Sequence, residues 1–171
     1  MNGMLRPALL GLAMLNLLPA VTGAAAAETY RLYRNERFGV SAEIPRNWKA
    51  GREPDNGDGL VFTSPDSAAT ITVSGSLNIA DSLTEAIEAE QTPDDGETVT
   101  YRRKSERMSV LSGTRGAVIF YRKAVLSCGD EIVNRVSIEY PLARKEAFDE
   151  LVSHVAGSLR GGPGAQIGKC K

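Results

Sequence analysis

Few residues of this chain are of the types that carry out nucleophilic, acid–base or metal chemistry. His154 is the only histidine, and the two cysteines are Cys128 and Cys170. No G-x-S-x-G nucleophile motif accompanies the histidine, and one histidine is too few for a typical zinc site. His154 also lies beside an apolar helical stripe, where a histidine at the boundary of the core is the commoner role. These residues predict neither a nucleophilic enzyme nor a zinc enzyme, and we expect no cofactor.

Acidic residues offer a second kind of chemistry, because two converging carboxylates can cleave a glycosidic bond. The candidates are Glu88, Glu90, Asp94 and Asp95, which lie around the end of an expected helix and the turn after it. Acidic side chains at such places are more often solvated than catalytic. A small envelope hydrolase with paired carboxylates is therefore the alternative to a non-enzymatic protein.

A further group of oxygen ligands occurs at Asp55, Asn56 and Asp58, and oxygen ligands are the kind that Ca²⁺ prefers. The calcium-loop spacing D-x-[DN]-x-[DN]-G-x5-E is absent. Gly57 and Gly59 alternate with Asn56 and Asp58, and these residue types suit tight turns. The segment is therefore predicted to be a turn, and no metal ligand is predicted.

Basic residues gather at Arg102, Arg103 and Lys104, and Arg107 follows shortly after. Side chains of consecutive strand residues point to opposite faces of a sheet. One interpretation is a solvated strand edge that discourages pairing between sheets. The other is a surface for an unknown envelope protein or an anionic envelope component. Nucleic acid is not an expected partner, because 20 Lys and Arg nearly balance 21 Asp and Glu.

Aromatic residues suggest a third function, a module that binds a small ligand on the face of a sheet. Trp48, Tyr101 and Tyr121 would then be exposed contacts. Packing in the core is the more frequent role of such side chains, so this interpretation stays an alternative.

The first 27 residues have the three parts of a secretory signal peptide. Arg6 supplies a positive charge, a leucine-rich run follows, and Ala25 and Ala27 form an A-x-A site before Glu28. The apolar run is interrupted well before the roughly 20 residues that a membrane span needs. We therefore expect cleavage between Ala27 and Glu28, a periplasmic or secreted protein, and no stable membrane span afterwards.

Export changes the meaning of the cysteines, because an oxidising compartment favours pairing of an even number of thiols. Cys128 lies in an expected hairpin turn, and Cys170 lies in a glycine-rich tail, residues 161–171. A disulfide would tie this tail back to the domain. A redox role is the weaker interpretation, because there is no C-x-x-C motif and no neighbouring histidine.

One domain, residues 28–160, must position these side chains. Alternating apolar residues predict strands at 38–44, 60–62, 69–74, 98–104, 108–112, 117–126 and 131–140. A helix begins near Asp81 or Ser82, and a second carries the apolar stripe Phe148, Leu151, Val152, Val155 and Leu159. This order of elements favours an α+β fold, with a sheet covered by helices.

The N-terminal part of the domain resembles the PsbP-like fold. Tyr33-x-Asn35-x-x-Phe38-Gly39, followed by Ile44-Pro45 and Trp48, is similar to the phrase Y-x-N-x-x-F-G-F-x-x-x-x-P-x-x-W of that family, with Val40 in place of the second phenylalanine. The chain looks most like uncharacterised exported bacterial proteins of this shape.

The resemblance implies an α/β/α-like sandwich around an antiparallel sheet. Family members of known function act as accessory or interaction modules, in photosystem assembly or in binding a small nuclear GTPase. The shared residues are turn and core residues, so they imply a fold more directly than an activity. With no recognisable catalytic group, the resemblance implies a non-enzymatic binding or accessory module of the cell envelope.

Overall fold

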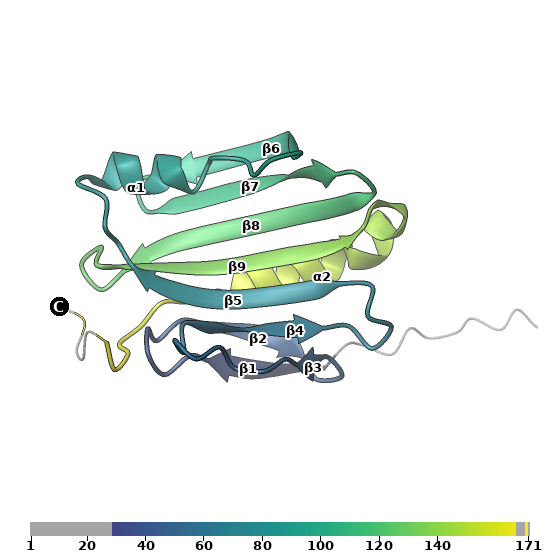
Figure 1. Ribbon diagram of the computed structural model, residues 1–171, viewed down its shortest axis with the longest axis horizontal. Coiled ribbons are helices and arrows are strands. Elements are labelled where there is room, and N and C mark those ends of the chain that lie inside the picture. The colour runs from purple at the N-terminus through teal and green to yellow at the C-terminus, as the bar shows by residue number, and fades with distance from the viewer. Residues whose placement is uncertain (1–28, 167–169, 171) are drawn as a thin grey trace, which may run out of the picture.

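The computed structural model describes residues 29–166 and residue 170 of the chain (Figure 1). The expected signal peptide and its cleavage site, Ala27 and Glu28, lie outside the described residues. In chain order the elements are β1 (Tyr30–Arg34), β2 (Ser41–Pro45), β3 (Lys49–Ala50), β4 (Gly59–Thr63), β5 (Thr70–Leu77), α1 (Leu83–Ala89), β6 (Thr98–Ser105), β7 (Met108–Arg115), β8 (Val118–Ser127), β9 (Ile132–Pro141), the short 3-10 helix η1 (Leu142–Arg144) and α2 (Lys145–Ser158). Within the described part, no helix is long and apolar enough to cross a membrane.

The strands form two antiparallel sheets. Seven of them make one sheet in the order β3-β4-β5-β9-β8-β7-β6, and β1 pairs with β2 in a separate two-stranded sheet. The long β8–β9 hairpin lies at the centre of the large sheet, as its alternating sequence predicts (Figure 1). The prediction of a single sheet is wrong at the N-terminus, because β1 and β2 pair with each other and not with the large sheet.

The two helices cover opposite faces of the large sheet. The apolar stripe of α2 packs with β2 and with residues such as Val136 and Ile138. On the other face, Ala86 and Ile87 of α1 pack against Ala124 of β8. The side chain of Ala124 points to the face opposite to that of its neighbours Lys123 and Val125. The molecule is therefore an α/β/α-like sandwich of the α+β class, as predicted.

Helix α1 begins where its sequence predicts. The Oγ of Ser82 accepts a hydrogen bond from the backbone N–H of Glu85 at 3.1 Å. The carboxylate of Glu85 in turn accepts the N–H of Asp81 at 2.9 Å. These reciprocal bonds satisfy donors that the first turn of a helix leaves free, so the start of α1 is fixed by local sequence.

The N-terminal motif holds the turn between β1 and β2. Asn35 is buried, its side chain accepts the N–H of Phe38 at 2.8 Å and it donates to the carbonyl of Gly57 at 2.9 Å. Gly39 has φ of +73°, and a Cβ there would lie 2.3 Å from the carbonyl oxygen of Gly162. The motif residues therefore serve turn geometry and close packing against the C-terminal tail.

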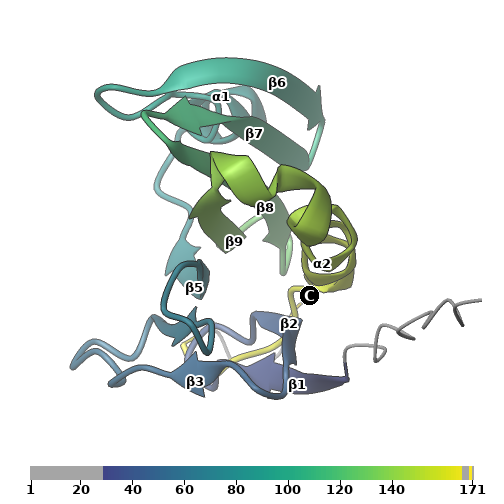
Figure 2. The same cartoon turned by 90° about the vertical axis from the view of Figure 1, so that its right-hand side faces the viewer.

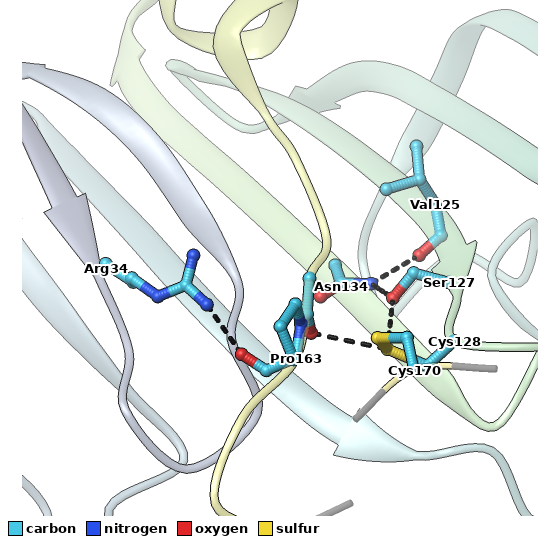
Figure 3. The surroundings of a disulfide bond; sticks show 8 residues. Arg34, Val125, Ser127, Cys128, Asn134, Pro163 and Cys170 are labelled. Carbon is cyan, nitrogen blue, oxygen red and sulfur yellow. Dashed lines mark hydrogen bonds between the residues drawn. A yellow bond between two sulfur atoms is a disulfide. The ribbon is translucent and has the colours of Figure 1, made fainter. Parts of the chain in front are cut away.

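The C-terminal tail is attached by a disulfide and by backbone hydrogen bonds. Cys170 is bonded to Cys128 of the β8–β9 turn (Figure 3). Arg160 exchanges two backbone hydrogen bonds with Ser41, each of 2.9 Å, and Ala165 donates to the carbonyl of Glu36 at 2.8 Å. The pairing of the two cysteines agrees with the prediction, but the tail is also packed independently of the disulfide as far as residue 166.

Candidate functional site

Helix α2 covers only part of its face of the sheet. Figure 2 shows α2 between β6 and β7 on one side and β1 and β2 on the other. Between α2 and the strands β6–β8 lies an open groove of about 710 Å³. It is lined by Thr100, Tyr101, Ser112, Gly113, Thr114, Ile119, Tyr121, Tyr140, Leu142, Lys145, Asp149, Val152 and Ser153. We call this feature the tyrosine groove.

The pairing of the strands arranges the residues on the floor of the tyrosine groove in rows that run across the sheet. Tyr101 of β6 pairs with Ser112 of β7, which pairs with Tyr121 of β8. One step along the strands, the next row contains Ile119 and Tyr140. Residues paired directly across antiparallel strands point to the same face. Three tyrosines from three strands are thereby brought to one face of the sheet.

The three tyrosines differ in exposure. The side chain of Tyr101 is 49% exposed, Tyr121 is half-buried, and Tyr140 is buried with its ring 4.9 Å from that of Phe148. Burial raises the pKa of Tyr121, and the nearby Tyr101 raises it further, while Arg103 acts in the opposite direction. Burial also raises the pKa of Tyr140. Both phenols therefore keep their protons at neutral pH.

A basic row lies directly beside the tyrosines. Arg103 of β6 pairs with Val110 of β7, which pairs with Lys123 of β8, so Arg103 and Lys123 share the groove's face. Lys123 Nζ donates to the carbonyl of Ala156 in α2 at 2.7 Å. Burial lowers the pKa of Lys123, and the positive charges of Arg160 and Arg103 lower it further. Arg103 and Lys123 thus lie in one row beside the tyrosines, whereas Arg160 lines a separate hollow with Ser41 and Glu43.

The predicted basic cluster is divided by the sheet. Arg102 donates to the carbonyl of Gln91, and Lys104 forms an ion pair with Glu88 at 3.5 Å, both on the side of α1. Arg107 holds Asp130 through two hydrogen bonds of 2.7 and 3.0 Å, which lower the pKa of that carboxyl. Of the four predicted residues, Arg103 alone has its side chain on the face of the tyrosine groove. The others contact groups of the chain itself.

The acidic residues of the hydrolase alternative have separate partners. Glu90 contacts Arg135 through hydrogen bonds of 2.9 Å, and Asp94 contacts Arg122 at 2.8 Å. Glu88 is the partner of Lys104, and Asp95 is exposed. No two of these carboxylates share a basic partner among the contacts of the described residues. Their arrangement offers no observation in favour of paired acid–base catalysis.

The other residues whose types could carry out chemistry also make contacts within the chain. His154 Nε2 lies 2.6 Å from the carboxylate of Glu43, and its ring stacks on Tyr30. Asn56 donates to Asp58 at 2.8 Å within their turn. Across residues 29–166 and 170, no group of three or more His, Cys, Asp or Glu side chains could hold a metal ion.

Sequence reasoning identified only part of the tyrosine groove. Tyr101 and Tyr121 are accessible, as the ligand-binding interpretation requires, but Trp48 is 4% exposed and belongs to the core. Lys123 and Leu142 were not singled out. Alternation places Lys123 on the same face as Tyr121, which is a usable signal, whereas the position of Leu142 depends on how α2 docks.

Comparison with known proteins identifies the fold. No protein-family model matches the chain, and no curated protein sequence matches it. The solution structure of cyanobacterial PsbP (CyanoP) from Synechocystis sp. PCC 6803 is similar, with a TM-score of 0.56 and 14% identity, over 84% of this chain and 98% of that chain. The Ran-binding protein Mog1p of Saccharomyces cerevisiae is similar with a TM-score of 0.53 and 11% identity, over 78% of this chain and 96% of that chain.

These similarities extend over nearly the whole of both solved domains, so they concern the architecture and not an isolated motif. At such low identity they carry information about the fold alone. The antiparallel sheet and the two covering helices agree with them. The chain therefore has the PsbP-like fold.

Proposed function

We propose that the protein is an exported, non-enzymatic binding or accessory module of the cell envelope, and that the tyrosine groove is its partner-binding surface. The observation that carries this proposal is the groove itself, where exposed Tyr101, half-buried Tyr121 and exposed Leu142 gather on the part of the face that α2 leaves uncovered. A leader of signal-peptide type and the Cys128–Cys170 disulfide support export. The similarity to a Ran-binding protein supports a binding role for the fold.

The composition of the tyrosine groove suits a protein segment as its occupant. Tyrosine is enriched among the residues that dominate binding energy, because it combines a large apolar ring with a polar group. Tyr101 and Leu142 are 49% and 45% exposed, so both offer apolar surface that a partner can bury. Ser112 and Thr114 add hydroxyl groups to the floor. An apolar side chain flanked by polar backbone fits such a lining.

Capture of partners in intact cells tests the proposal. The exported protein is cross-linked chemically in the cells that produce it, and its adducts are identified by mass spectrometry. We expect the double substitution Tyr101→Ser, Leu142→Ser to reduce the yield of a specific envelope adduct by about tenfold, because two exposed anchor side chains are lost.

Val61→Ser is the matched control. Val61 is 42% exposed, and it pairs with Thr72 on the opposite face of the sheet. The substitution therefore removes an apolar side chain of similar exposure at a place away from the groove. This control should keep the wild-type adduct. Equal loss with both variants, or equal capture by both, would contradict the proposed surface.

A further inference from the structure

We infer that the partner segment bound in the tyrosine groove is acidic, and that a carboxylate of this segment is anchored by Arg103 and Lys123, in the row of the sheet next to Tyr101 and Tyr121. This inference rests on the proposed function, because it names the chemistry of the partner for the same groove. It is carried by the position of these two cations and by what they contact.

The two cations come from separate strands but lie in one row. Arg103 and Lys123 are two strands apart in this row, which corresponds to about 10 Å between their backbones. Lys123 reaches α2, where its Nζ donates to the carbonyl of Ala156 at 2.7 Å. The row that contains Tyr101 is immediately next to that of Arg103. A segment lying along the tyrosines therefore reaches the cations within a few residues.

These cations keep donors available for a ligand. Lys123 uses one N–H to bond the carbonyl of Ala156. For the side chain of Arg103, no ion pair or hydrogen bond occurs among the described residues. A guanidinium carries five N–H donors and matches the geometry of a carboxylate. This row can therefore bind a carboxylate without breaking the contacts that hold α2.

Local charge favours an acidic occupant over a neutral one. Elsewhere in the described structure, arginines such as Arg115, Arg122 and Arg135 have carboxylate partners. Arg103 and Lys123 form no ion pair within residues 29–166 and 170. The carbonyl of Ala156 accepts a hydrogen bond from Lys123, but a carbonyl does not neutralise a cation. The acidic residue that lines the groove, Asp149, is paired with Lys145, so the row of Arg103 and Lys123 keeps its positive charge.

A protein segment explains the site better than a membrane surface. The cations adjoin a groove bounded by α2 on one side and β6 on the other, and a flat layer of lipid headgroups does not enter such a groove. An extended chain does, and it can place an apolar side chain between the tyrosines while a carboxylate reaches Arg103. We therefore assign the anchor to an aspartate, a glutamate or a terminal carboxylate of a protein.

Selection from a library of random short peptides displayed on phage tests this inference. The disulfide-bonded mature protein is the target, in wild-type form and as Arg103→Ser, Arg102→Ser and the double substitution Tyr101→Ser, Leu142→Ser. We expect wild-type protein to select peptides enriched in Asp and Glu. Their affinity should fall about fivefold with Arg103→Ser, because a partly exposed charge pair is lost, and it should fall with added salt.

Arg102→Ser is a close control, because it removes the same charge from the neighbouring residue on the other face of β6. It should leave both the acidic preference and the affinity unchanged. If peptides require the tyrosines but show no acidic preference, or bind Arg102→Ser and Arg103→Ser equally, the inference is wrong and the groove remains the binding surface. If selected peptides ignore the Tyr101→Ser, Leu142→Ser substitutions, the proposed function is wrong as well. Binding to phosphatidylglycerol vesicles that depends on Arg103, without selection of acidic peptides, would also overturn the inference.

Discussion

Replacing Cys128 and Cys170 by serine is expected to lower the free energy of unfolding by about 4 kcal/mol. The disulfide joins residues 42 positions apart, so it removes many conformations from the unfolded chain. It also closes a small apolar cluster with Phe38 and Ile132. The loss should be measured by urea denaturation of the oxidised wild-type protein and the double variant.

Reduction provides the control for this prediction. A reductant should destabilise the wild-type protein by a similar amount and leave the serine variant unchanged. If the variant unfolds within about 1 kcal/mol of wild type, the backbone bonds between residues 160–166 and 36–41 hold the tail without help from the disulfide. That outcome would contradict the expected contribution of the disulfide to the free energy of unfolding.

Replacing Phe62 by alanine is expected to cost about 3 to 5 kcal/mol of unfolding free energy. Phe62 is 2% exposed in the main core, and Tyr33 of the small sheet meets its ring edge-on at 5.2 Å between centroids. Its removal leaves a cavity where the two sheets meet, so both transfer energy and packing are lost. Thermal or urea unfolding of purified variants measures the change.

Two substitutions calibrate this result. Phe62→Leu keeps most of the volume and should cost less than about 1.5 kcal/mol. Leu32→Ala alters a side chain on β1 that is 68% exposed, and a change within about 0.5 kcal/mol is expected there. A loss below about 1 kcal/mol for Phe62→Ala would show that the sheets do not depend on this contact.

Much of the fold follows from local patterns in the sequence. The alternation from residue 131 to 140 identifies β9 and the side chains that it buries, and Ser82 with Glu85 identifies the start of α1. The apolar stripe from Phe148 to Val155 is buried in α2 as predicted. In each case the apolar spacing or the capping residue predicts the element that the structure has. Contacts with distant parts of the chain do not change that element.

Strand β2 overlaps the strand predicted at 38–44, but β1 (Tyr30–Arg34) was not predicted, because its burial does not follow a strand period. Phe38 to Ala42 are all buried, since the tail packs on one side of this segment and the core lies on the other. Conversely, the apolar Leu32 of β1 is exposed. These patterns are set by contacts between the two ends of the chain, and such contacts leave no regular spacing in the sequence.

The tyrosine groove was predictable from the sequence only in its strand residues. Alternation places Tyr101 on one face with Arg103 and places Arg102 and Lys104 on the other, and the structure has this division. Leu142 joins the site because of where η1 and α2 begin relative to the sheet. Helix docking depends on the whole core, so no local motif predicts this position.

Site-specific photo-cross-linking in intact cells tests most directly whether the tyrosine groove is the partner-binding surface. p-Benzoylphenylalanine is placed at position 101 in one protein and at position 61 in another, and the adducts are identified by mass spectrometry. The account predicts one reproducible envelope protein attached at position 101, with no such adduct from position 61. Attachment of the same partner from position 61 but not from position 101 would contradict the account, because it would place the binding surface on the opposite face of the sheet.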